Sequence, residues 1–148
     1  MMEKTYPLQM CQWRLAVIWL LGSCVLFILM AFQVAGGKYG NEDQKAWGWL
    51  LPQVLPILSM IGGAIVYQMN RSDENIVVTS FAYRATWVVS LIYLLLVLTT
   101  VALVPIAEQE QGIKPIDFLP KMGPVLTGLS AIASSILAAF FVSSKPKA

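Results

Sequence analysis

Residues 15–36 read LAVIWLLGSCVLFILMAFQVAG, a stretch without a single Asp, Glu, Lys or Arg. A helix rises about 1.5 Å per residue, so about 20 apolar residues cross the roughly 30 Å hydrocarbon core of a bilayer. The apolar core of a cleaved secretory signal is shorter, about 7–15 residues, which favours a retained span over a signal removed after Gly36. The stretch therefore predicts a transmembrane helix.

Three further stretches of similar length follow, at 47–69, 82–105 and 122–142. The whole chain is 57% hydrophobic and 12% charged, with a mean hydropathy of +0.69. A water-soluble chain of 148 residues needs far more polar surface than this. We therefore predict an all-α polytopic membrane protein, a single domain over residues 1–148 with four transmembrane helices in a bundle and both termini on the same side.

The second stretch contains two prolines with an amide between them. Pro52 and Pro56 each remove a backbone donor inside the predicted helix, so we expect a kink there and packing of this half against protein rather than lipid. Gln53 is an intramembrane polar residue. An interhelical hydrogen bond is the expected role, and a place along a polar path is the alternative.

The third and fourth stretches differ in their side chains. Residues 82–105 are rich in Leu and Val on every face, which predicts the greatest lipid contact. The fourth stretch has small residues at every fourth position: Gly123, Thr127, Ala131, Ser135 and Ala139. Such a ridge lets helices approach closely in lipid, so we expect a helix-packing interface within the bundle, with an oligomer interface between copies as the alternative.

The connection between these two stretches, residues 106–121, is the longest in the predicted topology. It holds acidic residues first and then apolar residues interrupted by Pro115 and Pro120. Such a segment is expected to lie irregularly in the membrane interface, with a partner contact or pore vestibule as the alternative.

Basic residues set the expected orientation. The side that carries both termini has six of them: Lys4, Arg14, Arg71, Arg84, Lys145 and Lys147. The opposite side has four: Lys38, Lys45, Lys114 and Lys121. Because the cytoplasmic side carries the excess, we predict a multi-pass protein of the cell membrane with both termini in the cytoplasm.

Residues expected to anchor the helices lie near the predicted span ends. They are Trp13, Arg14, Arg84 and Trp87 at one interface, and Trp47 and Trp49 at the other. Aromatic rings favour the headgroup level, and a long arginine side chain reaches it from within the span. A cage for a cation or a quinone is the alternative, but a distribution over both interfaces favours anchoring.

Residues with catalytic or metal-binding chemistry are scarce. The chain has no histidine, the commonest general base and metal ligand. Charged side chains are missing from the middle of the spans, where pumps keep them. Nor does the sequence carry a phosphate-binding loop. We expect no catalytic, cofactor or metal site, and no nucleic-acid partner.

Two function classes remain. The first is a non-enzymatic interaction, assembly or regulatory subunit that packs against the lipid bilayer and against another membrane protein or copies of itself. The second is a homo-oligomeric pore that permeabilises the membrane. A lipid-modifying membrane enzyme comes third.

Overall fold

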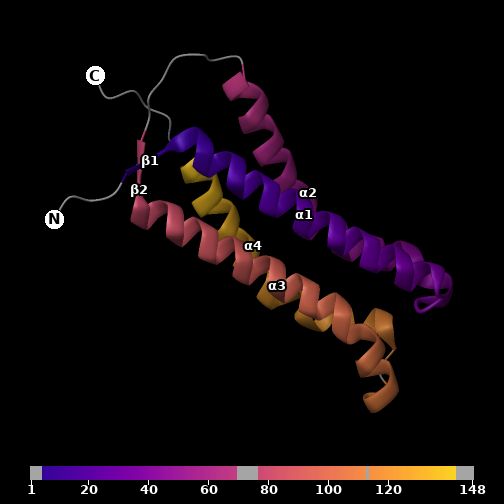
Figure 1. Cartoon of the computed structure of the whole chain (residues 1–148). Coiled ribbons are helices and arrows are strands. Elements are labelled where there is room, and N and C mark those ends of the chain that lie inside the picture. Colours follow the sequence, from indigo (N-terminus) through magenta and orange to yellow (C-terminus); the bar gives the residue numbers. More distant parts are fainter. Residues whose placement is uncertain (1–4, 70–76, 113, 143–148) are drawn as a thin grey trace.

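The chain folds into four long helices that pack side by side (Figure 1). The computed structural model describes residues 5–69, 77–112 and 114–142. The elements follow in the order β1 (Thr5–Pro7), α1 (Leu8–Ala35), a 3-10 turn η1 (Gly40–Glu42), α2 (Asp43–Met69), β2 (Val77–Thr79), α3 (Ser80–Gln111) and α4 (Pro115–Val142). Each helix holds a stretch long and apolar enough to cross a membrane. The predicted all-α, four-helix transmembrane bundle is confirmed.

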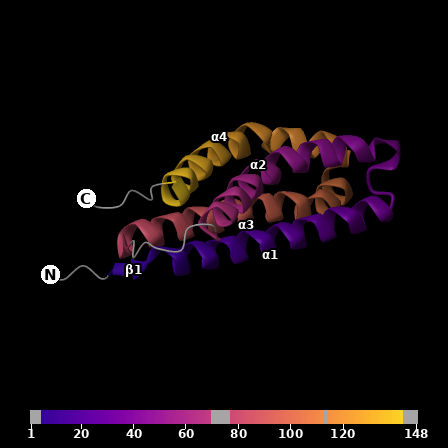
Figure 2. The same ribbon diagram turned by 90° about the horizontal axis from the view of Figure 1, so that it is seen from above.

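The four helices occupy the corners of a square in cross-section. Helix α1 packs against α2 and α3, and α4 packs against the same two helices. Figure 2 accordingly shows α1 and α4 on opposite sides, with α2 and α3 between them. Helices α1 and α3 both start at the strand end of the bundle and run in parallel, while α2 and α4 return. The described chain ends, β1 and the last turn of α4, lie at the same end (Figure 1).

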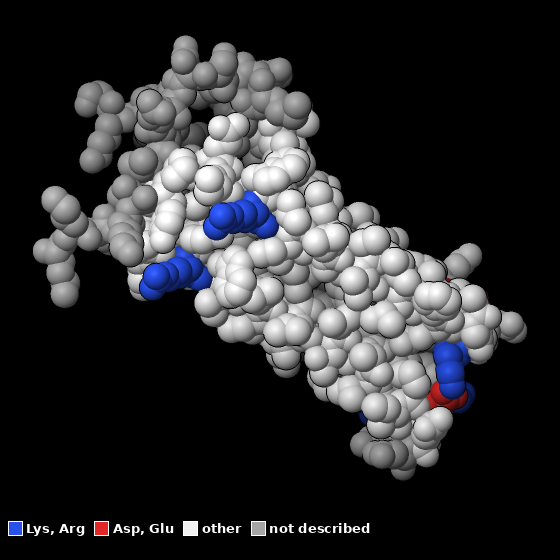
Figure 3. All heavy atoms as spheres, viewed as in Figure 1, with Lys and Arg blue, Asp and Glu red and all other residues white. Residues whose placement is uncertain are grey.

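The charges are placed as a membrane crossing requires. On the face in Figure 3, Lys and Arg lie toward the two ends of the bundle, and uncharged surface covers the length between them. Helix α1 has 28 residues, about 42 Å, and α3 has 32, about 48 Å. Both exceed the roughly 30 Å hydrocarbon core, so their ends extend into the headgroup region.

Glycines make the turn between α1 and α2. The backbone N–H of Gly36 donates to Phe32 O at 2.9 Å, and Gly37 adopts φ +69°. A residue with a Cβ is strained in that left-handed region, which explains glycine at this position. The turn brings α2 back antiparallel to α1 after a short connection.

The predicted interfacial segment at 106–121 is wrong. Helix α3 continues through Pro105 to Gln111, and α4 already begins at Pro115. Gly112, at φ +62°, ends α3 by donating its N–H to Glu108 O. Proline is favoured at the first helical position because its missing N–H would have no partner there. Because Gly112 ends α3 and Pro115 begins α4, the connection between the two helices is short.

The expected burial of the last two helices is also reversed. Helix α3 has the largest buried share of the four spans, 39% of its most apolar window, whereas α4 has 28%. The α3 residues buried in the bundle include Tyr93, Val97, Val101 and Val104. Leucine and valine side chains suit lipid and protein neighbours equally, so the composition of residues 82–105 could not distinguish the two environments.

A short antiparallel strand pair closes one end of the bundle. Strand β1 pairs with β2, with Tyr6 opposite Val78. The first described turn of α1 also reaches α4 across the diagonal, where Gln12 Nε2 donates to Phe140 O at 3.3 Å. These contacts hold the starts of α1 and α3 and the end of α4 together. Four of the basic residues assigned to the terminal side, Lys4, Arg71, Lys145 and Lys147, lie outside the described residues.

Candidate interaction surface

Helix α4 presents two different faces. Its inward face is made of larger side chains and one alanine, all buried in the bundle: Leu126, Ala133, Leu137, Phe140 and Phe141. The predicted ridge lies on the other face: Thr127, Ala131, Ser135 and Ala139 are exposed, and Gly123 is half-buried. The expectation that this ridge packs within the bundle is wrong. An oligomer or partner interface at these residues remains a prediction.

Serine hydroxyls on and beside the exposed ridge donate to the backbone of α4. Ser135 Oγ donates to Ala131 O, and Ser130 Oγ donates to Thr127 O, both at 2.8 Å. A Cβ added to Gly123 or Gly128 would meet no atom within 4 Å. The face therefore offers backbone at close range, and the hydroxyl of Ser135 already has a hydrogen-bond partner within the helix.

The amide of Gln53 takes part in a contact between helices. The Tyr93 hydroxyl on α3 donates to Gln53 Oε1 at 2.8 Å and to Gln53 O at 3.0 Å. The Tyr93 ring also lies 5.9 Å from the Trp19 ring of α1, between ring centroids. This tyrosine thus joins α3 to both α1 and α2 inside the membrane-spanning part. Sequence reasoning identified Gln53 but missed Tyr93, because one tyrosine among leucines has no periodic signal.

The prolines of α2 lie on its outward side. Pro52 and Pro56 are both inside the helix and both exposed, while Val54 and Ile57 are buried. The prolines themselves thus face outward, whereas the half of α2 that contains them packs into the bundle through Leu50 and Val54. Helix α2 changes direction along its length in Figure 2.

A second polar cluster lies at the end of the bundle opposite the strands. Gln33 Nε2 donates to Val101 O at 2.8 Å, and the Tyr39 hydroxyl donates to Gln33 Oε1 at 2.6 Å. Burial raises the pKa of Tyr39 to about 12. Beside it, Lys38 Nζ and Glu108 Oε2 form an ion pair at 3.4 Å, with the two side chains 38% and 41% exposed. The cluster fixes the register between α1 and α3.

The predicted anchoring residues separate into two groups. Trp13, Arg14, Arg84 and Trp87 surround one open groove between α1 and α3 near the strands. At the other end, Trp47 is half-buried against Phe27, and half-buried Trp49 lines a smaller surface pocket with Lys114 and Asp117.

Some buried polar atoms within α1 and α3 have no hydrogen-bond partner among the described residues. They are Trp19 Nε1, Ser23 Oγ and Ser90 Oγ. Within residues 5–69, 77–112 and 114–142, no group of three His, Cys, Asp or Glu side chains is close enough to hold a metal ion. Comparison with protein-family models, curated proteins and solved structures found no match.

Proposed function

We propose that this chain is a non-enzymatic subunit of a membrane assembly, which associates through the outward face of α4 with another membrane protein or another copy of itself. The observation that carries the proposal is the exposure of Thr127, Ala131, Ser135 and Ala139. Lipid tails solvate an apolar surface as well as protein does, so association in a bilayer depends on close packing. A face of small residues supplies that packing only when a second helix covers it.

The proposed setting is the cell membrane with both termini in the cytoplasm. This orientation rests on the excess of basic residues at the terminal side. The cytoplasmic side would then carry the strand pair, Arg14 and Arg84.

A matched set of leucine substitutions tests the role of the α4 face. Ala131→Leu places bulk on the exposed ridge, Ala133→Leu places it in the bundle interior, and Ala102→Leu places it on an exposed position of α3. We expect Ala131→Leu to weaken association by about 1–3 kcal/mol, the typical cost of overpacking a tight contact. Its monomer should remain as stable as the parent.

The two controls define what each outcome means. Ala133→Leu should destabilise the folded monomer, because this alanine is fully buried. Ala102→Leu should change neither the association of copies nor the stability of the monomer. Association is measured by energy transfer between labelled copies in liposomes, and by co-purification with the partner when it is another protein. Equal association of the parent, Ala131→Leu and Ala102→Leu in both measurements would refute the α4 face as an interface.

A homo-oligomeric pore is the second candidate. It is favoured by the hydroxyls of Thr127 and Ser135, which several copies could gather around a common axis. The bond between Tyr93 and Gln53 weighs against Gln53 as the pore lining, because that amide is already engaged between helices. Purified parent protein in dye-loaded liposomes decides between the candidates. Sustained dye leakage that is reduced by Ser135→Ala supports a pore. Absence of dye leakage, with and without a membrane potential, supports the proposed role as a subunit.

A further inference from the structure

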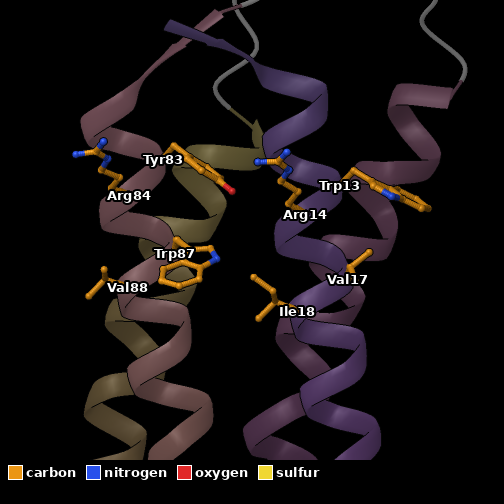
Figure 4. Close-up of a pocket in the computed structure, with 8 residues that line it drawn as sticks. All are labelled: Trp13, Arg14, Val17, Ile18, Tyr83, Arg84, Trp87 and Val88. Carbon is orange, nitrogen blue, oxygen red and sulfur yellow. The ribbon is translucent and has the colours of Figure 1, made fainter. Parts of the chain in front are cut away.

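An open groove of about 840 Å³ runs between α1 and α3 near the strand end of the bundle. This volume lies within the usual range of small-molecule sites, about 300–1,000 Å³. Figure 4 shows the arrangement of the groove. Trp87 and Ile18 point into the space between the helices, and Arg14 lies beside that space at its strand end, whereas Arg84 extends at the same level from the side of α3 away from α1. The groove is thus apolar along its length and cationic at its mouth.

The two arginines lie at the same depth in the membrane. Arg14 is followed by the uncharged residues 15–37 on α1, and Arg84 by the uncharged residues 85–107 on α3. The next charges, Lys38 and Glu108, are paired with each other at the far end. Because the parallel helices are held in register there, both arginines reach the same headgroup layer.

Both arginines are available for an external anion. Each is exposed, and none of the described residues that line the groove is acidic. Among the described residues, the ion pairs are those of Lys38 with Glu108 and Lys45 with Glu42, so neither arginine is paired there. A guanidinium binds phosphate oxygens through short, charge-assisted hydrogen bonds, often two at a time.

We propose that this groove binds one phospholipid with an anionic headgroup. Its phosphate contacts Arg14, Arg84 adds a second positive charge at the same depth, and its acyl chain lies along Val17, Ile18 and Val88. Trp87 closes one side of the chain, and the half-buried Tyr83 lies beside the headgroup. Basic pockets between transmembrane helices are known to hold anionic lipid headgroups on the cytoplasmic side. The lipid would fasten α1 to α3 at the end where the groove separates them.

Tryptophan quenching by brominated lipids tests the site in the full chain. The protein is reconstituted into phosphatidylcholine vesicles with a minor fraction of brominated phosphatidylglycerol, or the same fraction of brominated phosphatidylcholine. Trp47→Phe and Trp49→Phe remove the reporters at the far end. Of the three tryptophans that remain, Trp13 and Trp87 line the groove, and the fully buried Trp19 gives a constant background. We expect the brominated anionic lipid to quench more strongly, and native mass spectrometry to retain one phosphatidylglycerol per chain.

Substitutions at the mouth of the groove should remove the preference. Each basic group near a membrane surface contributes about 1 kcal/mol to anionic lipid binding, so Arg14→Gln and Arg84→Gln should each reduce the preference about fivefold. The corresponding lysine variants should retain most of it. Lys121→Gln, a loss of charge at the opposite end of the bundle, should leave it unchanged.

Other occupants give different results, and each overturns the proposal. Equal quenching by the two brominated lipids in the parent protein shows an apolar groove without anion preference, whether or not the arginine variants fold. Displacement of the lipid by inorganic phosphate shows a simple anion site. Quenching that disappears as the protein-to-lipid ratio rises shows that a second copy covers the groove. If Lys121→Gln loses as much of the preference for the anionic lipid as the arginine variants do, the lipid is attracted by the overall surface charge and not by the groove.

Discussion

The hydrogen bond from Tyr93 to Gln53 provides a measurable link between α3 and α2. Tyr93→Phe removes the hydroxyl that donates to Gln53 Oε1 at 2.8 Å and to Gln53 O at 3.0 Å. The ring contact with Trp19 is preserved, because phenylalanine keeps the aromatic ring. The substitution therefore tests the polar contact separately from the packing.

The expected magnitude follows from the membrane setting. Interhelical hydrogen bonds in membrane proteins contribute about 0.6 kcal/mol on average and about 1.7 kcal/mol at most in double-mutant cycles. Tyr93 is 1% exposed, so no water replaces the lost donor. We expect Tyr93→Phe to lower the free energy of unfolding by about 1–2 kcal/mol. Gln53→Leu should cost a similar amount, and the double variant should cost less than the sum.

The assay is reversible unfolding in mixed micelles, in which an anionic detergent is titrated into a mild one and helicity is followed. Tyr83→Phe is the matched control, because the Tyr83 ring packs against Phe140 and its hydroxyl makes no hydrogen bond within the described residues. Strict additivity of Tyr93→Phe and Gln53→Leu would refute the interaction. A loss in Tyr83→Phe as large as in Tyr93→Phe would do the same.

Three further predictions concern the end of the bundle opposite the strands. Gly112→Ala should cost about 1 kcal/mol in the same unfolding assay, because the glycine is held at φ +62°, and an unchanged stability would argue against this turn. Burial raises the pKa of Tyr39 to about 12, above the ordinary value of about 10, so its neutral form stabilises the fold below pH 10 and this contribution declines as the pH rises toward 12. Between these pH values the parent should therefore lose more stability than Tyr39→Phe, and equal losses would contradict the burial argument. A cysteine at exposed Asn41 should react with an impermeant reagent added outside intact cells, while tags at both termini should be reached only after permeabilisation; the opposite pattern would invert the orientation.

The number of spans could be predicted from the sequence because length and apolarity alone decide it. The ends of the helices could not be predicted as accurately as their number. Most of the loop predicted at 106–121 belongs to the ends of α3 and α4. A proline inside a membrane helix need not end the helix: Pro105 lies within α3, and α4 contains Pro120 and Pro124. The informative signals were Gly112 followed by Pro115, a stop and a start only three positions apart.

The sequence could not predict which face of each helix contacts lipid, for a different reason. In water, a buried face is apolar and an exposed face is polar, so periodicity reveals both. In lipid both faces are apolar, and only the size of the side chains differs. The small residues of α4 were correctly recognised as a feature, but the structure was needed to place Ala131 outside and Ala133 inside. The contacts of Gln12, Gln33 and Tyr93 depend on three-dimensional register and left no local pattern.

The strand pair has a consequence for the order in which the protein assembles. Tyr6 emerges from the ribosome early, yet its partner Val78 follows two helices later. At about 5–20 residues per second, several seconds pass between the synthesis of the two strands. During that interval α1 and α2 enter the membrane as a helical hairpin whose first strand has no mate. Strand β2 directly precedes α3, so we expect the pairing of β1 with β2 to place the start of α3 beside the start of α1 before α4 has been made.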